Sequence, residues 1–172
     1  MREGLDGFAF AAGIPGTVGG AVRMNAGAYG GEMAQVVKSV EVMAMDGEIL
    51  TLDNATMEFG YRTSAIKSRP YVVLEVELAL TGGSSEEIAK RMQELAQKRR
   101  EKQPLEYPSA GSTFKRPEGM FAGKLIMDAG LSGKSCGGAQ ISEKHCGFII
   151  NKGTATAADI AQLIAETTKT VQ

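Results

Sequence analysis

Seven polar residues of the sequence can bind a charged ligand or exchange a proton, and each falls in a predicted loop or at a strand end. Binding and catalytic residues gather in such segments, because a rigid scaffold positions them there. Each also has a structural interpretation, such as a surface ion pair for Arg62 or a turn-capping hydroxyl for Ser112. The seven are Arg62, Ser112, Lys115, Arg116, Gln140, His145 and Asn151.

The stretch from Gly13 to Gly31, GIPGTVGGAVRMNAGAYGG, has the composition of a surface for a flat or anionic ligand. It holds seven of the chain's 22 glycines, no Asp or Glu, and one charge, Arg23. Pro15 and its neighbours predict a turn, and the small residues 17–21 predict a tightly packed helix after it. Backbone N–H groups at a helix start can bind an anion. The alternative is that these glycines only form turns and close contacts.

Several common sites are excluded by what the sequence lacks. It contains neither G-x-G-x-x-G nor G-x-x-x-x-G-K-[ST], so the dinucleotide-binding and P-loop motifs are absent. Cys136, Cys146 and the single His145 do not supply the four ligands of a structural zinc site, so we expect no metal. With one histidine, His145, a Ser-His-Asp hydrolase is disfavoured unless that residue serves it. Two cysteines do not make a disulfide framework, so we expect both to be free thiols, buried or without a role, in a reducing cytosol.

Length and charge limit the fold and the partners. A chain of 172 residues forms one domain or two small ones. Its 19 Lys and Arg against 20 Asp and Glu give a net charge of −1, which argues against broad binding to nucleic acid or anionic membranes. No apolar run approaches the ~18 residues of a membrane span. We therefore expect neither nucleic acid nor membrane as a partner.

Alternating and turn-forming residues predict the elements of the first part of the chain. Residues 36–45 and 48–52 predict two strands, and Asp46-Gly47 between them predicts a hairpin turn. Asn54 is expected to cap a short turn that follows. Residues 71–80 predict the next strand.

Helix signals dominate the second part. A capping box at Ser84 starts a helix that ends in the cationic run 98–102, which suits the negative end of the helix dipole or clamps a phosphate. Residues 120–129 predict a short helix, and 148–150 a strand that pairs around a turn with one at Ile141. A final helix begins at a capping box in residues 156–159.

Four blocks of the sequence occur in the order of one known family. They are GIPGTVGGAVRMNAGAYGGE, FGYRTS, SAGSTFKRP and GGAQISEKHCGFIINKGTATAADI. Together they cover nearly the whole chain and resemble UDP-N-acetylmuramate dehydrogenase, the flavoprotein family also called UDP-N-acetylenolpyruvoylglucosamine reductase, or MurB. The SAGSTFKRP block without a long insertion after YRTS resembles the family's shorter class.

The resemblance implies an α+β fold with two domains. Residues 1–103 resemble the second FAD-binding subdomain of a two-subdomain flavin fold, and residues 104–172 resemble a small α/β substrate-binding domain that is truncated. The sequence is thus expected to be a fragment without the N-terminal FAD subdomain and the extreme C-terminus, where the family carries a catalytic glutamate. Half a flavin site loses the enclosure that makes binding tight, so we expect the chain alone to be inactive and not to retain FAD.

The resemblance also implies the activity of the complete protein. This is an oxidoreductase that uses FAD and NADPH to reduce UDP-N-acetylglucosamine enolpyruvate to UDP-N-acetylmuramate, acting on a CH–CH group. We expect a cytoplasmic enzyme of peptidoglycan synthesis, which serves cell-wall biogenesis, cell shape and cell division. Its small-molecule substrate is the enolpyruvyl ether of a UDP-sugar.

Site residues follow from matching motifs. Arg62, in the YR motif, falls on the family's catalytic arginine. A guanidinium is always charged and can bind the substrate carboxylate through two parallel hydrogen bonds. Ser112, in AGS-x-F, falls on the family's proton-donating serine. A hydroxyl suits this role, since it keeps its proton at pH 7. The residues expected against the flavin are Ile14, Gly16, Thr17, Gly19 and Gly20. Those expected against the substrate are Tyr61, Lys102, Lys115, Arg116, Gln140 and His145.

Two other functions remain alternatives. FAD-linked oxidases share the flavin fold and the IPG-x-VGG type of loop, although the Ser112 loop and the GFIIN block resemble the reductase's third domain. The other alternative is a non-catalytic fragment that binds a sugar nucleotide through Lys102 and the substrate domain.

Overall fold

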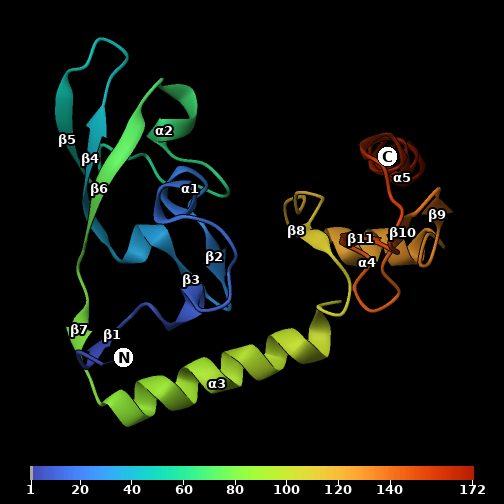
Figure 1. The fold of residues 1–172 in the computed structure, drawn as a ribbon, viewed down its shortest axis with the longest axis horizontal. Helices are drawn as coiled ribbons and strands as arrows, with labels where there is room; N and C mark the ends of the chain where they lie inside the picture. The colour runs from blue at the N-terminus through green and yellow to red at the C-terminus, as the bar shows by residue number, and fades with distance from the viewer. Residues whose placement is uncertain (1) are drawn as a thin grey trace. The chain divides into compact units, whose positions relative to one another are not determined.

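A computed structural model describes residues 2–172, and the chain divides into two compact units, Met1–Gln97 and Lys98–Gln172. The boundary falls inside helix α3 (Ser85–Lys102). Each unit has its own hydrophobic core. Figure 1 shows the helices and strands of both units, coloured along the chain. Both combine helices with antiparallel sheets, so the expected α+β class is confirmed.

The first unit is built on a three-stranded antiparallel sheet with β4 (Val37–Met43) at its centre. On one side β4 pairs with β5 (Ile49–Asp53), as the Asp46-Gly47 turn predicts, and on the other with β6 (Val72–Leu78). Alternation along β4 buries Val40 and Val42 in the core. The ladder between β4 and β6 shifts register at Leu74, which is exposed beside Glu75.

One expectation at the end of β5 is wrong. The carboxylate of Asp53 caps the following turn, because its Oδ1 accepts a hydrogen bond from the N–H of Thr56 at 2.8 Å. The side chain of Asn54 points elsewhere and donates from Nδ2 to the carbonyls of Ala34 at 2.9 Å and Val37 at 2.7 Å. An amide can satisfy carbonyl oxygens, whereas a carboxylate can only accept, so the two neighbours divide these tasks.

Short elements occupy the glycine-rich stretch. Helix α1 (Val18–Arg23) is capped by Thr17, whose hydroxyl accepts from the N–H of Gly20 at 3.1 Å, which confirms the predicted helix. The hairpin of β2 (Gly27–Ala28) and β3 (Gly31–Glu32) follows, and then the 3-10 helix η2 (Met33–Gln35). An earlier 3-10 helix, η1 (Ala9–Ala11), packs on this hairpin.

Three further elements complete the first unit. Helix α2 (Ala65–Ser68) contacts α1, and β1 (Leu5–Asp6) pairs with β7 (Thr81–Gly82). Helix α3 starts after Ser84, whose hydroxyl accepts from the N–H of Glu87 at 3.5 Å. The predicted start of this helix is therefore confirmed.

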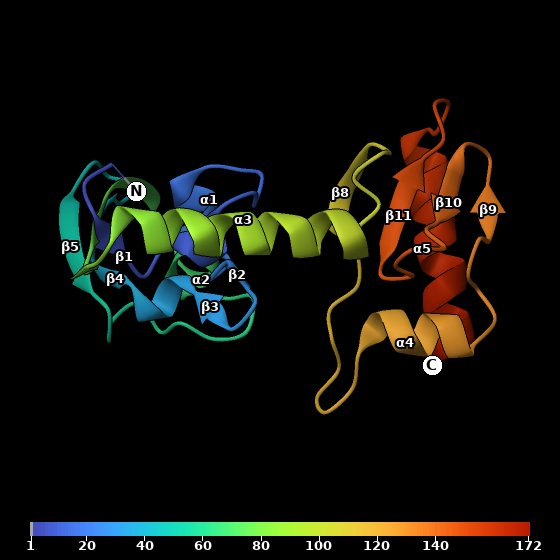
Figure 2. The same ribbon diagram turned by 90° about the horizontal axis from the view of Figure 1, so that it is seen from below.

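The second unit contains a four-stranded antiparallel sheet in the order β8-β11-β10-β9. Its strands are β8 (Ser109–Ser112), β9 (Ser135–Cys136), β10 (Ala139–Ile141) and β11 (Phe148–Asn151). Helices α4 (Ala122–Asp128) and α5 (Ala157–Val171) contact each other, and α5 lies alongside the sheet (Figure 2). Ile126, Ile141 and Leu163 join these layers in one buried cluster.

Helix α5 begins at the predicted capping box. The Thr156 hydroxyl accepts from the N–H of Asp159 at 3.1 Å, and the Asp159 carboxylate accepts from the N–H of Thr156 at 2.8 Å. The same carboxylate accepts from the N–H of Gly138 at 3.4 Å, which ties the helix to the turn between β9 and β10. Hydrogen bonds from the Thr156 N–H and hydroxyl hold the pKa of Asp159 below its ordinary value of 3.8.

Replacing Gly31 should destabilise the first unit, because a Cβ there would lie 2.5 Å from the Phe10 ring. We expect Gly31→Ala to lower the free energy of unfolding in urea by about 1–3 kcal/mol, the usual cost of overpacking. Gly82→Ala is the matched control, since no atom lies within 4 Å of its Cβ position. The added change Phe10→Leu should recover part of the loss. Equal effects of the two alanine variants would contradict this account.

Asp159 should make the second unit less stable in acid. Its folded pKa is depressed, so its stabilisation is present above the ordinary value of 3.8 and is lost as the pH falls through the folded pKa. In urea unfolding followed by circular dichroism, the stability difference between the native chain and Asp159→Asn should shrink as the pH is lowered. Asp128→Asn, which removes an exposed ion pair with Lys124, is the control. A difference that stays constant with pH would refute the assignment.

Candidate functional site

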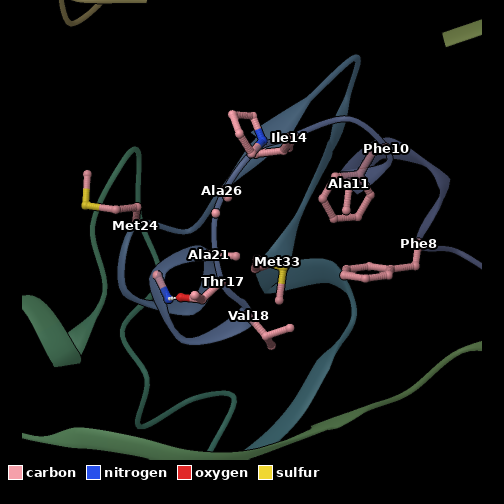
Figure 3. Close-up of a pocket in the computed structure, with 13 residues that line it drawn as sticks. Phe8, Phe10, Ala11, Ile14, Thr17, Val18, Ala21, Met24, Ala26 and Met33 are labelled. Carbon is pink, nitrogen blue, oxygen red and sulfur yellow. Dashed lines mark hydrogen bonds between the residues drawn. The ribbon is translucent and has the colours of Figure 1, made fainter. Parts of the chain in front are cut away.

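A cavity of about 450 Å³ opens beside α1 in the first unit (Figure 3). Its lining is largely apolar, and the rings of Phe8 and Phe10 stand edge to face on one side, with their centroids 5.5 Å apart. Met33, fully buried, lies between them and α1, and Met24 lies on the opposite side. The cavity thus offers apolar walls to a flat, uncharged group.

Four of the five residues expected against a flavin line this one cavity. They are Ile14, Gly16, Thr17 and Gly20. The fifth, Gly19, faces the sheet instead, since a Cβ there would lie 3.5 Å from the Cβ of Val73. Successive residues of a helix point about 100° apart, so Gly19 and Gly20 point in different directions.

The backbone at the mouth of the helix is open. Gly16 has φ +136°, a conformation that favours glycine, and no other atom lies within 4 Å of its Cβ position. A ligand can therefore approach the main chain here without meeting a side chain. This opening and the packing of Gly19 on the sheet account for two of the motif's glycines, Gly16 and Gly19.

Arg62 sits in a tight turn between Gly60 and Thr63, which exchange two backbone hydrogen bonds of 3.1 and 3.2 Å. Its φ is +56°, which is uncommon for a residue with a side chain. The guanidinium donates from Nη2 to the carbonyl of Gly27 at 3.1 Å and from Nη1 to that of Asn25 at 3.5 Å. These bonds use two of its five N–H groups. The Arg62 Cζ also lies 5.2 Å from the ring centre of Tyr61, which is 49% exposed.

In the second unit, Ser112 and His145 face the same place. Ser112 ends β8 opposite Phe148, and Gly147 follows His145 in the turn between β10 and β11. A Cβ at Gly147 would lie 2.9 Å from Cε1 of His145 and 3.3 Å from Oγ of Ser112. The glycine thus leaves room between a hydroxyl and an imidazole.

The orientation of His145 is fixed by its neighbours. Its Nδ1 accepts from the N–H of Gly147 at 3.1 Å, and its ring stands 4.9 Å from that of Phe148 at 69°. A neutral imidazole that accepts at Nδ1 carries its proton on Nε2. His145 therefore presents an N–H donor at Nε2.

The remaining predicted residues are placed less closely together. Gln140, on β10, donates from Nε2 to the carbonyl of Gly133 at 3.0 Å and to Oγ of Ser135 at 3.1 Å, so its amide serves the neighbouring strand. Lys115 and Arg116 are exposed in the loop after β8. Lys102 is exposed at the last position of α3.

The lining residues that were not predicted as site residues include the large apolar side chains of Phe8, Phe10 and Met33. The signal for the two aromatic residues was their position just before the glycine stretch, but a lone aromatic pair more often belongs to a core. Met33 lies after that stretch and returns to it only through the β2–β3 hairpin. Only the folded hairpin, which packs on η1 and leads into Met33, shows that these three residues line the same cavity.

Two features of the described residues, 2–172, limit other interpretations. Nowhere in this range do three His, Cys, Asp or Glu side chains gather as a metal site would require. None of the helices in the same range is long and apolar enough to cross a membrane.

Two family models match the chain. Residues 103–172 match "UDP-N-acetylenolpyruvoylglucosamine reductase, C-terminal domain", and residues 2–53 match "FAD binding domain". The second match contains the whole lining of the cavity, from Phe8 to Met33. The first contains both Ser112 and His145.

Curated relatives match over nearly the whole chain. UDP-N-acetylenolpyruvoylglucosamine reductase of Lachnoclostridium phytofermentans is 57% identical over 99% of this chain and 55% of its own length. The protein of the same name from Clostridium botulinum strain Alaska E43 is 58% identical over 100% of this chain and 57% of its own. The chain thus spans little more than half the length of these relatives.

A solved structure matches in the same way. The crystal structure of UDP-N-acetylenolpyruvylglucosamine reductase from Thermus caldophilus is 42% identical, with a TM-score of 0.90 over 98% of this chain and 62% of that one. In sequence, domain models and fold alike, the chain is similar to part of the UDP-N-acetylenolpyruvoylglucosamine reductases.

Proposed function

We propose that this chain carries part of the active site of a reductase that converts UDP-N-acetylglucosamine enolpyruvate to UDP-N-acetylmuramate with FAD and NADPH. The observation that carries the proposal is the cavity of the first unit. Four motif residues, Ile14, Gly16, Thr17 and Gly20, line one apolar hollow within the segment that matches an FAD-binding domain. Residues 1–103 would then form a flavin subdomain and residues 104–172 the substrate domain.

The residues of the cavity fit a flavin. A volume of about 450 Å³ lies in the range of small-molecule sites. The Phe8 and Phe10 rings and Met33 offer apolar contact, and Gly16 leaves the backbone open to a ring edge. When bound there, FAD supplies the hydride that reduces the enolpyruvyl double bond, after NADPH has reduced the cofactor. The protein's part is to hold the ring and exclude water.

Arg62 would stabilise the charge that this reduction creates. Addition of hydride at C3 of the enolpyruvyl group leaves negative charge at C2, which spreads into the adjoining carboxylate. A guanidinium is always charged and can hold a carboxylate through two parallel hydrogen bonds. Because the turn and two carbonyls already fix Arg62, little reorganisation is needed as the charge builds up.

Ser112 would complete the reaction by protonating C2. The hydroxyl retains its proton at neutral pH, unlike an ordinary carboxyl group, and an enolate carbon is basic enough to take it. Ser112 is exposed at the end of β8, and the glycine at 147 leaves space in front of its hydroxyl. The Nε2–H of His145 offers a hydrogen bond to the substrate in the same place.

The remaining polar residues suit the nucleotide part of the substrate. Lys102, Lys115 and Arg116 are exposed cations that can pair with a diphosphate, and Tyr61 and Gln140 offer further polar groups. The match of residues 103–172 to the reductase's C-terminal domain supports this substrate over those of FAD-linked oxidases. We infer a cytoplasmic enzyme of peptidoglycan synthesis.

Ser112→Ala tests this assignment in a complete reductase that contains this segment. We expect reduction of the flavin by NADPH to remain near normal, because no proton is delivered to substrate in that half-reaction. Reduction of the enolpyruvyl substrate should fall about 10²-fold or more, the low end of the effect of a general acid. Both rates can be followed by stopped-flow absorbance of the flavin.

Ser109→Ala is the matched control, since Ser109 lies on the same strand and its hydroxyl only accepts from the N–H of Gly111 at 3.4 Å. It should leave both rates near those of the native enzyme. If the Ser112 variant turned over the substrate as fast as this control, Ser112 would not be the proton donor.

A further inference from the structure

Helix α1 ends at a residue whose conformation calls for glycine. The N–H of Ala26 bonds to the carbonyl of Ala21 at 2.8 Å, and the N–H of Asn25 bonds to that of Val22 at 3.2 Å. This pair of bonds is the Schellman motif, and Asn25 holds its left-handed position with φ +41°. Glycine takes this conformation at no steric cost. An asparagine here therefore indicates a task for its side chain.

Both ends of the Asn25 amide are used. The residue is 1% exposed, its Nδ2 donates to the carbonyl of Gly60 at 3.0 Å, and its Oδ1 accepts from the N–H of Ala34 at 2.9 Å. One buried side chain thus joins three segments: the end of α1, the turn of residues 60–63, and the start of η2. A buried polar side chain that is bonded at both ends in this way favours a single arrangement of the chain.

The turn that Asn25 holds is the one that carries Arg62. Its amide fixes Gly60 two residues before Arg62, and its own carbonyl accepts from Nη1 of Arg62. Asn25 therefore acts on both the backbone and the head group of the arginine. The second carbonyl on the guanidinium, that of Gly27, lies two residues beyond Asn25.

We propose that Asn25 is a positioning residue for Arg62, which it holds in the orientation needed to meet the substrate carboxylate. The inference rests on the proposed function for its catalytic meaning. Asn25 is itself buried and touches the arginine, not the reacting atoms. It therefore affects the reaction only through the geometry of Arg62, where an error of about 1 Å can cost 10²-fold in rate.

Other contacts should preserve the fold when the amide is removed. The Ser64 hydroxyl donates to the carbonyl of Arg23 at 2.9 Å, and Nη1 of Arg23 donates to the carbonyl of Ile66 at 2.8 Å. These bonds also tie the segment after the turn to the end of α1. Loss of the Asn25 side chain should thus act on residues 60–63 and on the start of η2, where the N–H of Ala34 loses its acceptor.

Two variants and a matched control separate positioning from a general loss of stability. Asn25→Gly keeps the left-handed helix end and removes the amide. Asn25→Asp keeps the shape and places an oxygen against the Gly60 carbonyl. Asn54→Asp is the control, because the Nδ2 of Asn54 likewise donates to the backbone, at the carbonyls of Ala34 and Val37, and these bonds involve neither Gly60 nor Arg62.

The first readout is the mobility of Arg62 in the 172-residue chain, measured by ¹⁵N relaxation of its Nε–H group. We expect the order parameter to fall below about 0.6 in both Asn25 variants and to stay near the native value in Asn54→Asp. Should Asn25→Asp fail to fold, Asn25→Gly carries the test. An Arg62 side chain as ordered as in the native chain in folded Asn25→Gly would overturn the proposal.

The second readout is turnover of a complete reductase that contains this segment. In Asn25→Gly we expect kcat for substrate reduction to fall about 10²-fold, with KM and flavin reduction by NADPH near native. Unchanged kcat together with a large loss in Arg62→Lys would overturn the catalytic role of Asn25. Full activity of Arg62→Lys itself would instead overturn the proposed role of Arg62, so the two failures are distinguishable.

Discussion

The first unit depends on how the six-residue helix α1 is held at its two ends. At its start, the Thr17 hydroxyl accepts from the N–H of Gly20, and the open backbone of Gly16 faces the cavity. At its end, Asn25 turns the chain through a left-handed residue and binds the segment that carries Arg62. So short a helix has few bonds of its own, and its side-chain caps therefore decide where it lies.

The second unit places its polar groups by a different device. Ser112 is the last residue of β8, and His145 lies in the turn just before β11. The antiparallel pairing of β8 with β11 therefore sets the distance between the two side chains. A glycine at 147 leaves the space between them open. At the other edge of this sheet, the Asp159 carboxylate accepts from the N–H of Gly138 and so ties α5 to the turn between β9 and β10. The side chains proposed to act on the substrate thus stand on a frame that backbone hydrogen bonds hold in place.

The proposed chemistry divides between a permanent charge and a neutral acid. A guanidinium stabilises negative charge without giving up a proton, and a hydroxyl gives up a proton only to a strong base. Arg62 is accordingly fixed by carbonyl oxygens, which do not compete as a carboxylate would for its charge. Ser112 is exposed, which keeps its hydroxyl accessible. The environment of each group suits the role proposed for it.

The sequence by itself determined the local elements: the Asp46-Gly47 hairpin, the helix after the glycine turn and the capping box of α5 are all confirmed, because neighbouring residues specify them. Contact of the motif residues with a flavin or substrate stays a prediction. Only the tertiary structure showed that Gly19 faces Val73 while Gly20 lines the cavity, and that Asn54 bonds to Ala34. It alone linked Asn25 to Gly60, 35 residues away. Such bonds depend on which segments the folded core brings side by side, and local propensity does not predict contacts between segments that are distant in the sequence.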